Sequence, residues 1–346
     1  MKIIVCGTDW GRNYLLAIRS RRRKNPSFDL VGIVARGSSS SRKTAAEFNL
    51  PLYNSISDVP AVDMACVAVG GEAGDLIALE CLQRGIHVLC EHPRKPDFIA
   101  EALRCSKSFR AVFHIHGFTE TKSVRVFLET CKKAGGRKAA RFVSAAGNSR
   151  SLYSLVDLMG RAFGTLKPFL FNPAPHGPAL EHAKSGRQVF RIVRGQLAGI
   201  PATFQSRQSI KDDGWEPVSH HVIVGFPTGN LVMLEAFGPL IWSYRPLYFR
   251  IHGLTGTEPM SIQLTSSLTF ERWSDLRIRM LARAIESLCK QVKTGKCPNE
   301  QRPYHLMQVS SVWERLSADL HGSSRRTDGR VKRIHRGTPS LHPGCR

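Results

Sequence analysis

The sequence has no apolar run that could cross a membrane. No stretch approaches the roughly 20 consecutive apolar residues of a spanning helix, although 42% of the 346 residues are hydrophobic. Met1 leads directly into a strand-like run, without the apolar segment and small-residue cleavage site of a secretory signal. These absences predict a cytoplasmic protein that does not bind a membrane.

Paired or metal-binding cysteines are also missing. The chain has nine cysteines, an odd number, and they lie in apolar surroundings such as Ala65-Cys66-Val67. No Cys-x-x-Cys pair occurs, and neither the cysteines nor His220-His221 have the spacing of a metal site. We expect buried free thiols in a reducing compartment, and no metal.

Acidic side chains are scarce. Asp and Glu number 27 against 50 Lys and Arg, which gives a net charge of +23. Residues 322–346 hold seven Lys or Arg and one Asp, a net of +6, so +17 remains on the rest of the chain. Such a surface indicates an acidic partner or nonspecific affinity for polyanions, or else simply an arginine-rich composition. No basic motif is interleaved with aromatics, so we expect no specific nucleic acid.

The first twenty residues predict a strand, a glycine turn and a helix, in that order. Lys2 to Cys6 is an apolar run typical of a buried parallel strand, and the turn from Gly7 to Gly11 precedes helix-compatible residues 13–20. Such a turn lets backbone N–H groups approach a diphosphate. Its residues, and therefore the candidate diphosphate site, are Gly7, Thr8, Asp9, Trp10 and Gly11. The spacing is shorter than the full dinucleotide motif, so a tight turn without a ligand remains an alternative.

A second candidate site follows the next strand, residues 28–34. An acidic residue at this strand end binds the ribose of NAD, whereas arginine with hydroxyls accepts the 2′-phosphate of NADP. The segment from 35 to 42 has no acid, and its candidate phosphate ligands are Arg36, Ser38, Ser39 and Arg42. It therefore favours NADPH. The alternative is a flexible serine-rich loop before a helix at 43–48.

Two further strand ends complete the candidate crevice. The strand at 63–69 ends in Val69 and Gly70, which suit a loop under the nicotinamide. The strand at 87–90 ends in Glu91-His92-Pro93, and open α/β sheets bind ligands at such ends. His92 is a candidate proton donor because the pKa of histidine, about 6.5, lies near working pH. A histidine that only holds cofactor or backbone is the alternative.

The order of the segments predicts an α/β protein. Residues 1–120 alternate between strands and helices, which indicates a doubly wound Rossmann domain that binds NADP. Residues 121–322 predict an α+β domain for substrate or oligomerisation, with a mostly antiparallel, open-faced sheet. Its helices are expected at 152–163, at 273–293, returning toward the first domain, and at 303–320. Residues 323–346 predict a basic, disordered tail.

Together these features resemble the glucose–fructose oxidoreductase/inositol dehydrogenase (Gfo/Idh/MocA) superfamily. Most members carry Glu-Lys-Pro where this chain has Glu91-His92-Pro93. Within the superfamily, local strings are similar to the thiazolinyl imide reductases of siderophore assembly lines. The Ala-Arg-Gly-Ser and Glu-His-Pro strings are the most specific. The similar stretches are 10–15, 34–38, 50–53, 84–93 and 155–160, which cover the first 165 residues well and the rest loosely.

The resemblance implies an NADPH-dependent reduction of a C=N bond, from thiazoline to thiazolidine, in the synthesis of a siderophore of the pyochelin or yersiniabactin kind. The substrate would be a thioester on the phosphopantetheine arm of a peptide synthetase's carrier domain. That carrier domain is the expected partner, and a homodimer through the C-terminal sheet is one candidate assembly.

The resemblance also assigns residues. It places Gly7, Thr8, Trp10 and Gly11 at the diphosphate and Arg36, Ser38 and Ser39 at the 2′-phosphate, with Glu91 and His92 in the strand-end motif. A tyrosine suggested as the family's proton donor aligns with Thr119, whose hydroxyl is a poor acid, so His92 is the donor unless the alignment slips. Asp157 is the third catalytic candidate because it could orient His92 or the substrate; a salt bridge on the helix surface or between the domains is its alternative.

Two other functions stay open. One is a sugar or polyol dehydrogenase of the same superfamily, disfavoured because the usual lysine and the acid after the second strand are missing. The other is a non-catalytic protein that binds a dinucleotide or a polyanion, which the charge of +23 supports.

Overall fold

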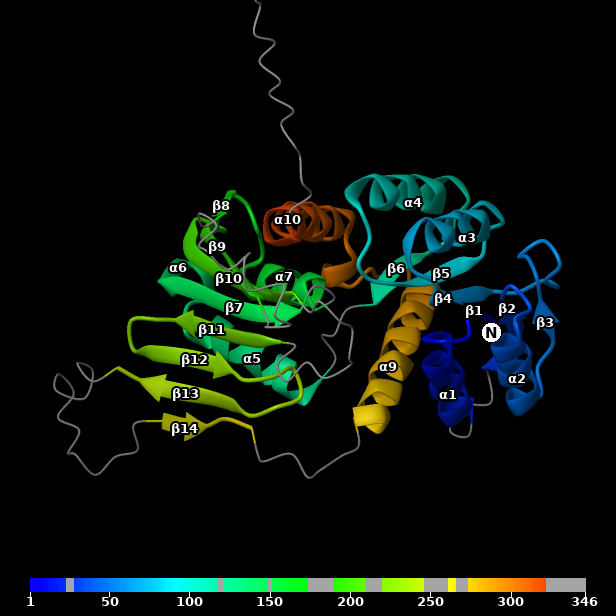
Figure 1. Cartoon of the computed structure of the whole chain (residues 1–346), viewed down its shortest axis with the longest axis horizontal. Coiled ribbons are helices and arrows are strands. Elements are labelled where there is room, and N and C mark those ends of the chain that lie inside the picture. The colour runs from blue at the N-terminus through cyan, green and yellow to red at the C-terminus, as the bar shows by residue number, and fades with distance from the viewer. Residues whose placement is uncertain are drawn as a thin grey trace, which may run out of the picture.

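The structure is a computed structural model of the chain. It describes residues 1–22, 28–116, 121–148, 151–173, 189–208, 220–245, 261–265 and 273–321. In Figure 1 a parallel sheet with its helices lies beside a second, mostly antiparallel sheet, and α10 lies across the junction between them.

The first sheet has six parallel strands in the order β3-β2-β1-β4-β5-β6. The order reverses between β1 and β4, so a ligand crevice is expected at the carboxyl ends there. This confirms the predicted doubly wound Rossmann domain. The strands are β1 (Lys2–Cys6), β2 (Asp29–Val34), β3 (Leu52–Tyr53), β4 (Met64–Val67), β5 (His87–Glu91) and β6 (Phe113–His116).

Four helices cover this sheet, and two of them begin earlier than predicted. The helix expected from residue 43 begins at Ser39, because the Ser38 side chain caps it by accepting a hydrogen bond from the Ser41 N–H. The pattern of residues 76–84 also predicts a helix, which in the structure begins earlier, at Gly71. The helices are α1 (Gly11–Arg22), α2 (Ser39–Phe48), α3 (Gly71–Gln83) and α4 (Pro96–Ser108).

The second sheet has eight strands in the order β14-β13-β12-β11-β7-β10-β9-β8. Among its described strands only β7 and β10 pair in parallel, which confirms the mostly antiparallel domain. The sequence pattern predicts strands at 140–144, 189–197, 202–209, 221–226, 231–237 and 247–252. Strands β8, β13 and β14 are therefore not predicted, and residues 247–252 lie outside the described residues. The strands are β7 (Phe142–Asn148), β8 (Phe169–Pro173), β9 (Val189–Leu197), β10 (Ile200–Gln208), β11 (His221–Gly225), β12 (Gly229–Met233), β13 (Leu240–Tyr244) and β14 (Ser261–Gln263).

The remaining helices join the two parts. As predicted, the helix at 152–163 leads into the second sheet and the late helix α9 returns to the first domain, where it packs on α1 (Figure 1). Helix α10 packs against both α7 and α4. These elements are α5 (Lys122–Lys133), α6 (Gly136–Ala139), α7 (Leu152–Phe163), α9 (Trp273–Thr294), the short 3₁₀ turn η2 (Asn299–Gln301) and α10 (Pro303–His321).

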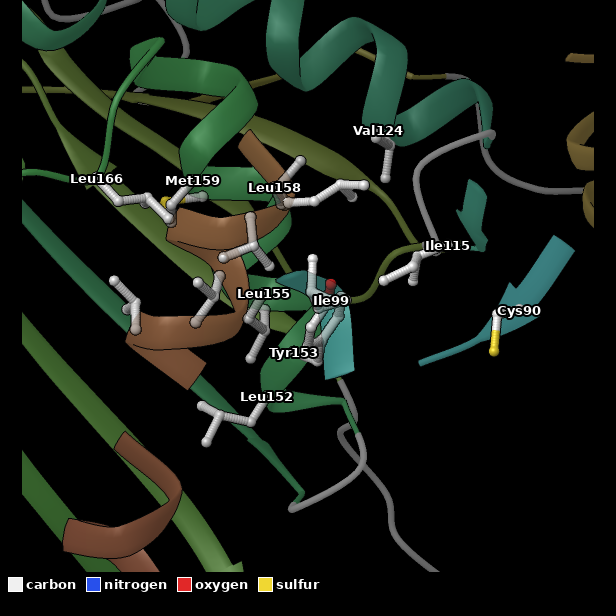
Figure 2. Close-up of a cluster of buried hydrophobic side chains, with 14 of the residues drawn as sticks. Cys90, Ile99, Ile115, Val124, Leu152, Tyr153, Leu155, Leu158, Met159 and Leu166 are labelled. Carbon is white, nitrogen blue, oxygen red and sulfur yellow. The ribbon is translucent and has the colours of Figure 1, made fainter. Parts of the chain in front are cut away.

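Two apolar clusters cover the opposite faces of the parallel sheet. Alternate residues of β1 divide between them, as the side-chain period of a strand requires: Ile3 and Val5 pack with α1 and α9, and Ile4 and Cys6 pack toward α3 and α4. The cluster that contains Ile4 and Cys6 continues without a break into α7 and the second sheet. Figure 2 shows this continuity, with α7 residues gathered near Ile99 of α4 and Ile115 of β6. The rigid base of the site is this shared core.

The described part of the chain agrees with the predicted cysteine chemistry. Seven of its eight cysteines are buried, and all eight are free thiols. No group of three or more metal-ligating side chains occurs there. Among the described helices, none combines the length and the apolar character needed to span a bilayer.

Candidate active site at the carboxyl edge of the parallel sheet

The predicted diphosphate turn lies at the switch point between β1 and β4. Gly7 has a φ of +94°, and its N–H donates to the Val34 carbonyl at 2.9 Å. A Cβ added at Gly7 would lie 3.0 Å from Cγ2 of Val69, so glycine lets β1 and β4 approach here. Helix α1 starts at the buried Gly11, shortly after the carboxyl end of β1, so its N-terminus lies at this edge of the sheet. Thr8 and Asp9 lie in the turn between them.

Trp10, in the same turn, is covered by a residue from the far end of the sequence. The guanidinium carbon of Arg277, on α9, lies 4.4 Å from the centroid of the Trp10 ring. Burial lowers the pKa of Arg277, although the nearby Glu91 carboxylate opposes the shift. The buried Nε1 of Trp10 lies near the Glu91 carboxylate, and its N–H opposes the rise of the Glu91 pKa that burial causes. Arg277 was not predicted, because no local motif marks it.

The predicted 2′-phosphate residues gather at the N-terminus of α2. Arg36, Ser38, Ser39 and Arg42 are all exposed, and neither arginine forms a salt bridge with any described residue. A row of hydroxyls links them to the diphosphate turn: Ser41 Oγ lies 2.9 Å from Ser38 Oγ and 3.2 Å from Thr8 Oγ1. Ser41, which was not predicted as a site residue, joins the two halves of the candidate cofactor site.

Arg94 fixes the segment that follows β4. Its guanidinium donates to the carbonyl oxygens of Val69 (2.7 Å), Gly71 (3.2 Å) and Glu91 (2.8 Å). It also pairs with Asp75 at 2.6 Å, and only 3% of its surface is exposed. A Cβ added at Gly70 or Gly71 would have no heavy atom within 4 Å, so the segment borders open space. Arg94 therefore holds Val69 and Gly70 beside a space where a nicotinamide could lie.

Glu91 is a largely buried carboxylate at the carboxyl end of β5. The Tyr14 hydroxyl donates to Glu91 Oε1. Burial raises the pKa of Glu91, and burial raises the pKa of Tyr14 well above its usual value. Glu91 Oε2 lies 4.0 Å from His92 Nδ1. Tyr14 thus connects the first helix to the strand-end motif.

His92 is held in one tautomer by its two neighbours. Nδ1 lies 2.6 Å from the His116 carbonyl oxygen, which can only accept, so Nδ1 carries the proton. In the neutral ring Nε2 then accepts a hydrogen bond from the Ser154 hydroxyl at 3.0 Å. The ring stacks on Tyr153, with centroids 5.3 Å apart. Burial lowers the pKa of His92, so the neutral form dominates near pH 7.

The other two predicted catalytic residues have different outcomes. Asp157 forms a hydrogen bond with His305 of α10, Oδ1 to Nε2 at 2.7 Å; both residues lie in the predicted second domain, so this contact is not the interdomain salt bridge that was an alternative. The residues of α7 that contact His92 are Tyr153 and Ser154, one turn earlier. Thr119 lies outside the described residues. His116 is buried beside this group, and its burial lowers its pKa to about 4.

The described residues fit a dinucleotide. Glycine closes the first turn where a Cβ would meet Val69, and the two exposed arginines at α2 form no salt bridge with any described residue. The neutral, hydrogen-bonded His92 follows β5, which pairs with β4, the strand that leads to Val69 and Gly70. This combination suits hydride transfer with a separate proton source.

Comparisons with known proteins agree with this fold. Residues 1–115 match the family model described as "Oxidoreductase family, NAD-binding Rossmann fold" (GFO_IDH_MocA). Residues 138–243 match the model "Thiazolinyl imine reductase Irp3-like, C-terminal". No curated protein sequence matches the chain.

Solved structures share the whole architecture at low identity. UDP-N-acetylglucosamine 3-dehydrogenase from Acidithiobacillus ferrooxidans is 13% identical with a TM-score of 0.67, over 92% of this chain and 97% of that one. Biliverdin reductase from Synechocystis, in complex with biliverdin and NADP⁺, is 14% identical with a TM-score of 0.66, over 90% of this chain and 98% of that one. At such identities the likeness shows the fold alone.

Proposed function

We propose that this chain is an NADPH-dependent reductase of a carbon–nitrogen double bond that converts a carrier-tethered thiazoline to a thiazolidine during siderophore synthesis. Its two matched regions make it an NAD(P)-dependent oxidoreductase of the Gfo/Idh/MocA type with an Irp3-like C-terminal domain. The observation that carries the substrate class is the second match, since its residues 138–243 include α7, which supplies Ser154 and Tyr153 to the His92 site.

NADPH is the proposed cofactor because of the charges at α2. A 2′-phosphate needs cations and short hydroxyl donors, and Arg36, Arg42, Ser38 and Ser39 gather at one helix N-terminus, where backbone N–H groups point outward. No acidic residue follows β2 to bind a free ribose hydroxyl instead. These features support NADPH over NADH.

The protein's own contribution to the chemistry is to deliver a proton. When bound, the reduced nicotinamide supplies a hydride to the carbon of the C=N bond, and the nitrogen then needs one proton. His92 already holds a proton on Nδ1, so it must take a second one on Nε2, which faces Ser154 Oγ. We place the path there: Ser154 gives its hydroxyl proton to the nitrogen and takes the Nε2 proton of His92. One hydride and one proton balance the reduction.

The tethered substrate implies a carrier domain as partner, and the basic surface supports docking of an acidic carrier. The candidate docking residues are Arg21, Arg22, Arg23 and Lys24. Arg21 is already paired with Glu286 of α9 at 2.9 Å, and Arg22 is exposed. Arg23 and Lys24 lie outside the described residues.

One assay tests the function. Oxidation of NADPH is measured with a carrier-bound thiazoline and with a free thiazoline thioester, and reduction of NADP⁺ is measured with a panel of polyols. We expect turnover with the two thiazolines and none with the polyols. Turnover with a polyol alone would make the chain a sugar or polyol dehydrogenase. Cofactor binding without turnover of any substrate would leave a non-catalytic binding protein.

A further inference from the structure

The second domain carries a basic hollow at the opposite end of α7 from His92. It lies where the C-terminal ends of α5 and α7 meet α6, and its volume is about 580 Å³. Eight residues separate Tyr153 from Arg161 in the hollow's lining, which is about 12 Å along the helix axis. The charged residues of the lining are Glu129, Lys132, Arg137, Lys138 and Arg161.

The cations of this hollow have no counter-ions. The lining has four positive side chains and one negative, and none of the five forms a salt bridge within the described part of the chain. Lys132, Arg137 and Lys138 are exposed, whereas Arg161 is half-buried. A second observation concerns Arg161 alone: its Nη1 is buried and has no hydrogen-bond acceptor among the described residues. A buried donor without a partner is costly, so turning the guanidinium toward a ligand in the hollow would relieve that cost.

Helix ends explain only part of this arrangement. Cations are favoured at helix C-termini, and Lys132 and Arg161 lie in the last turns of α5 and α7. A cation that served only the helix end would direct its N–H groups at the free carbonyls or at water. Arg161 Nη1 reaches neither solvent nor, in the part of the chain that the structure describes, an acceptor.

Glycines keep the hollow open. Gly135 has a φ of +96°, and a Cβ there would lie 2.7 Å from Cβ of Ala139. Gly164 ends α7 with a φ of +74°. Both positions lie in the lining, and both exclude ordinary side chains from it.

We propose that this hollow binds a small ligand that carries a pyrophosphoryl or phosphoryl group. Guanidinium and ammonium groups are the usual partners of phosphate oxygens, and the volume falls within the 300–1,000 Å³ of ligand pockets. The net charge of the lining favours a ligand with several negative charges over a single carboxylate. This site is separate from the proposed reaction site, so its ligand does not compete with the thiazoline.

Titration calorimetry of the full chain tests the site. Inorganic pyrophosphate, phosphate and sulfate are titrated at constant ionic strength into the wild type, Arg161→Gln, and a triple variant with alanine at positions 132, 137 and 138. Because the α2 edge also attracts phosphate, the quantity compared is the affinity lost between wild type and variant. The control is Lys107→Ala, which removes an exposed charge from α4.

We expect pyrophosphate to bind more tightly than phosphate or sulfate, and Arg161→Gln to weaken it by tenfold or more. The triple variant, whose changes are on exposed side chains, should weaken it at least as much without affecting folding, and Lys107→Ala should leave it unchanged. Identical isotherms for the wild type and both hollow variants would overturn the proposal. An equal loss in Lys107→Ala would also overturn it, because the effect would then be one of general charge.

Discussion

At the carboxyl ends of β1 and β2, the groups assigned to the cofactor come from two short segments, 7–11 and 36–42, and their cations face solvent. Around His92 the groups come from segments that lie far apart in the sequence, between residues 92 and 305. They are largely buried, and each forms a hydrogen bond with another group of the set. His92 contacts His116 and Ser154, and Asp157 of the same helix contacts His305. The two regions are neighbours at one sheet edge.

The difference has a physical consequence for substitutions. Exposed side chains without partners act independently, so their effects on binding should add. Buried groups that share hydrogen bonds depend on one another, and removing one leaves its partner unsatisfied. The cofactor edge should therefore respond in affinity alone, whereas the His92 cluster should respond in turnover and pH dependence.

The largest expected effect is that of His92→Ala. Loss of the proton donor should lower kcat by about 10²–10⁴, the usual contribution of general acid catalysis. NADPH binding should be nearly unchanged, because the cofactor groups lie on other strand ends. Steady-state kinetics and calorimetry measure the two quantities. If Thr119→Val abolished turnover and His92→Ala did not, the donor would be Thr119.

The two regions also differ in how far their residues could be predicted. Gly7, Arg36 and Ser38 are marked by motifs within a few residues of a strand, so the sequence predicts their place at the sheet edge. The early start of α2 was missed because serine is a poor helix former but a good cap, and Ser38 acts as the cap.

Long-range partners could not be predicted in this way. Arg277 reaches Trp10 only because α9 packs on α1, and His305 reaches Asp157 only because α10 crosses α7. Ser154 could be placed on its helix, residues 152–163, but nothing local shows that this turn faces His92. Strand β8 is short and is separated from α7 by residues 164–168, and it pairs with β9, a strand beyond residues 174–188. Such contacts depend on tertiary packing.

Arg36→Ala should have the next largest effect. It removes charge-assisted hydrogen bonds to the 2′-phosphate, which contribute roughly 1.5–3 kcal/mol. The affinity for NADPH should therefore fall by about ten- to a hundredfold. NADH lacks this phosphate, so its affinity should not change. Calorimetry with both cofactors measures the difference, and equal dissociation constants for the wild type would contradict the assignment.

The effect of Arg277→Ala should be smaller than that of Arg36→Ala and should differ in kind. Arg277 lies over Trp10 in the diphosphate turn, and both cofactors share the diphosphate. Their affinities should therefore fall together, by about tenfold, if the cation contributes one charge-assisted bond. Lys290→Ala, an exposed change on the same helix, is the control. Loss of NADPH affinity alone would place Arg277 at the 2′-phosphate instead.

Ser154→Ala tests whether the cluster is coupled. The Ser154 hydroxyl donates to Nε2 of neutral His92, and burial lowers the pKa of His92. If protonated His92 is the source of the proton, kcat should rise as pH falls through that lowered pKa. In the proposed path the proton passes from His92 through the Ser154 hydroxyl, so Ser154→Ala should lower kcat across this pH profile, by less than the loss of His92 itself. An unchanged kcat throughout the profile would show that Ser154 only packs.

The smallest expected effect is that of salt on the carrier-bound substrate. Exposed charge pairs contribute about 0–1 kcal/mol each, so a basic surface acts mainly on the rate of encounter with an acidic carrier. The Debye length falls from about 8 Å at 0.15 M salt to about 3 Å at 1 M. Raising salt should thus lower kcat/KM for the tethered thiazoline and barely change it for a small neutral thioester. Deleting residues 323–346 should leave most of the effect, because +17 of the +23 charge lies before residue 322. An identical salt response for both substrates would assign the charge to another ligand, and the basic hollow at Arg161 would then be its first candidate site.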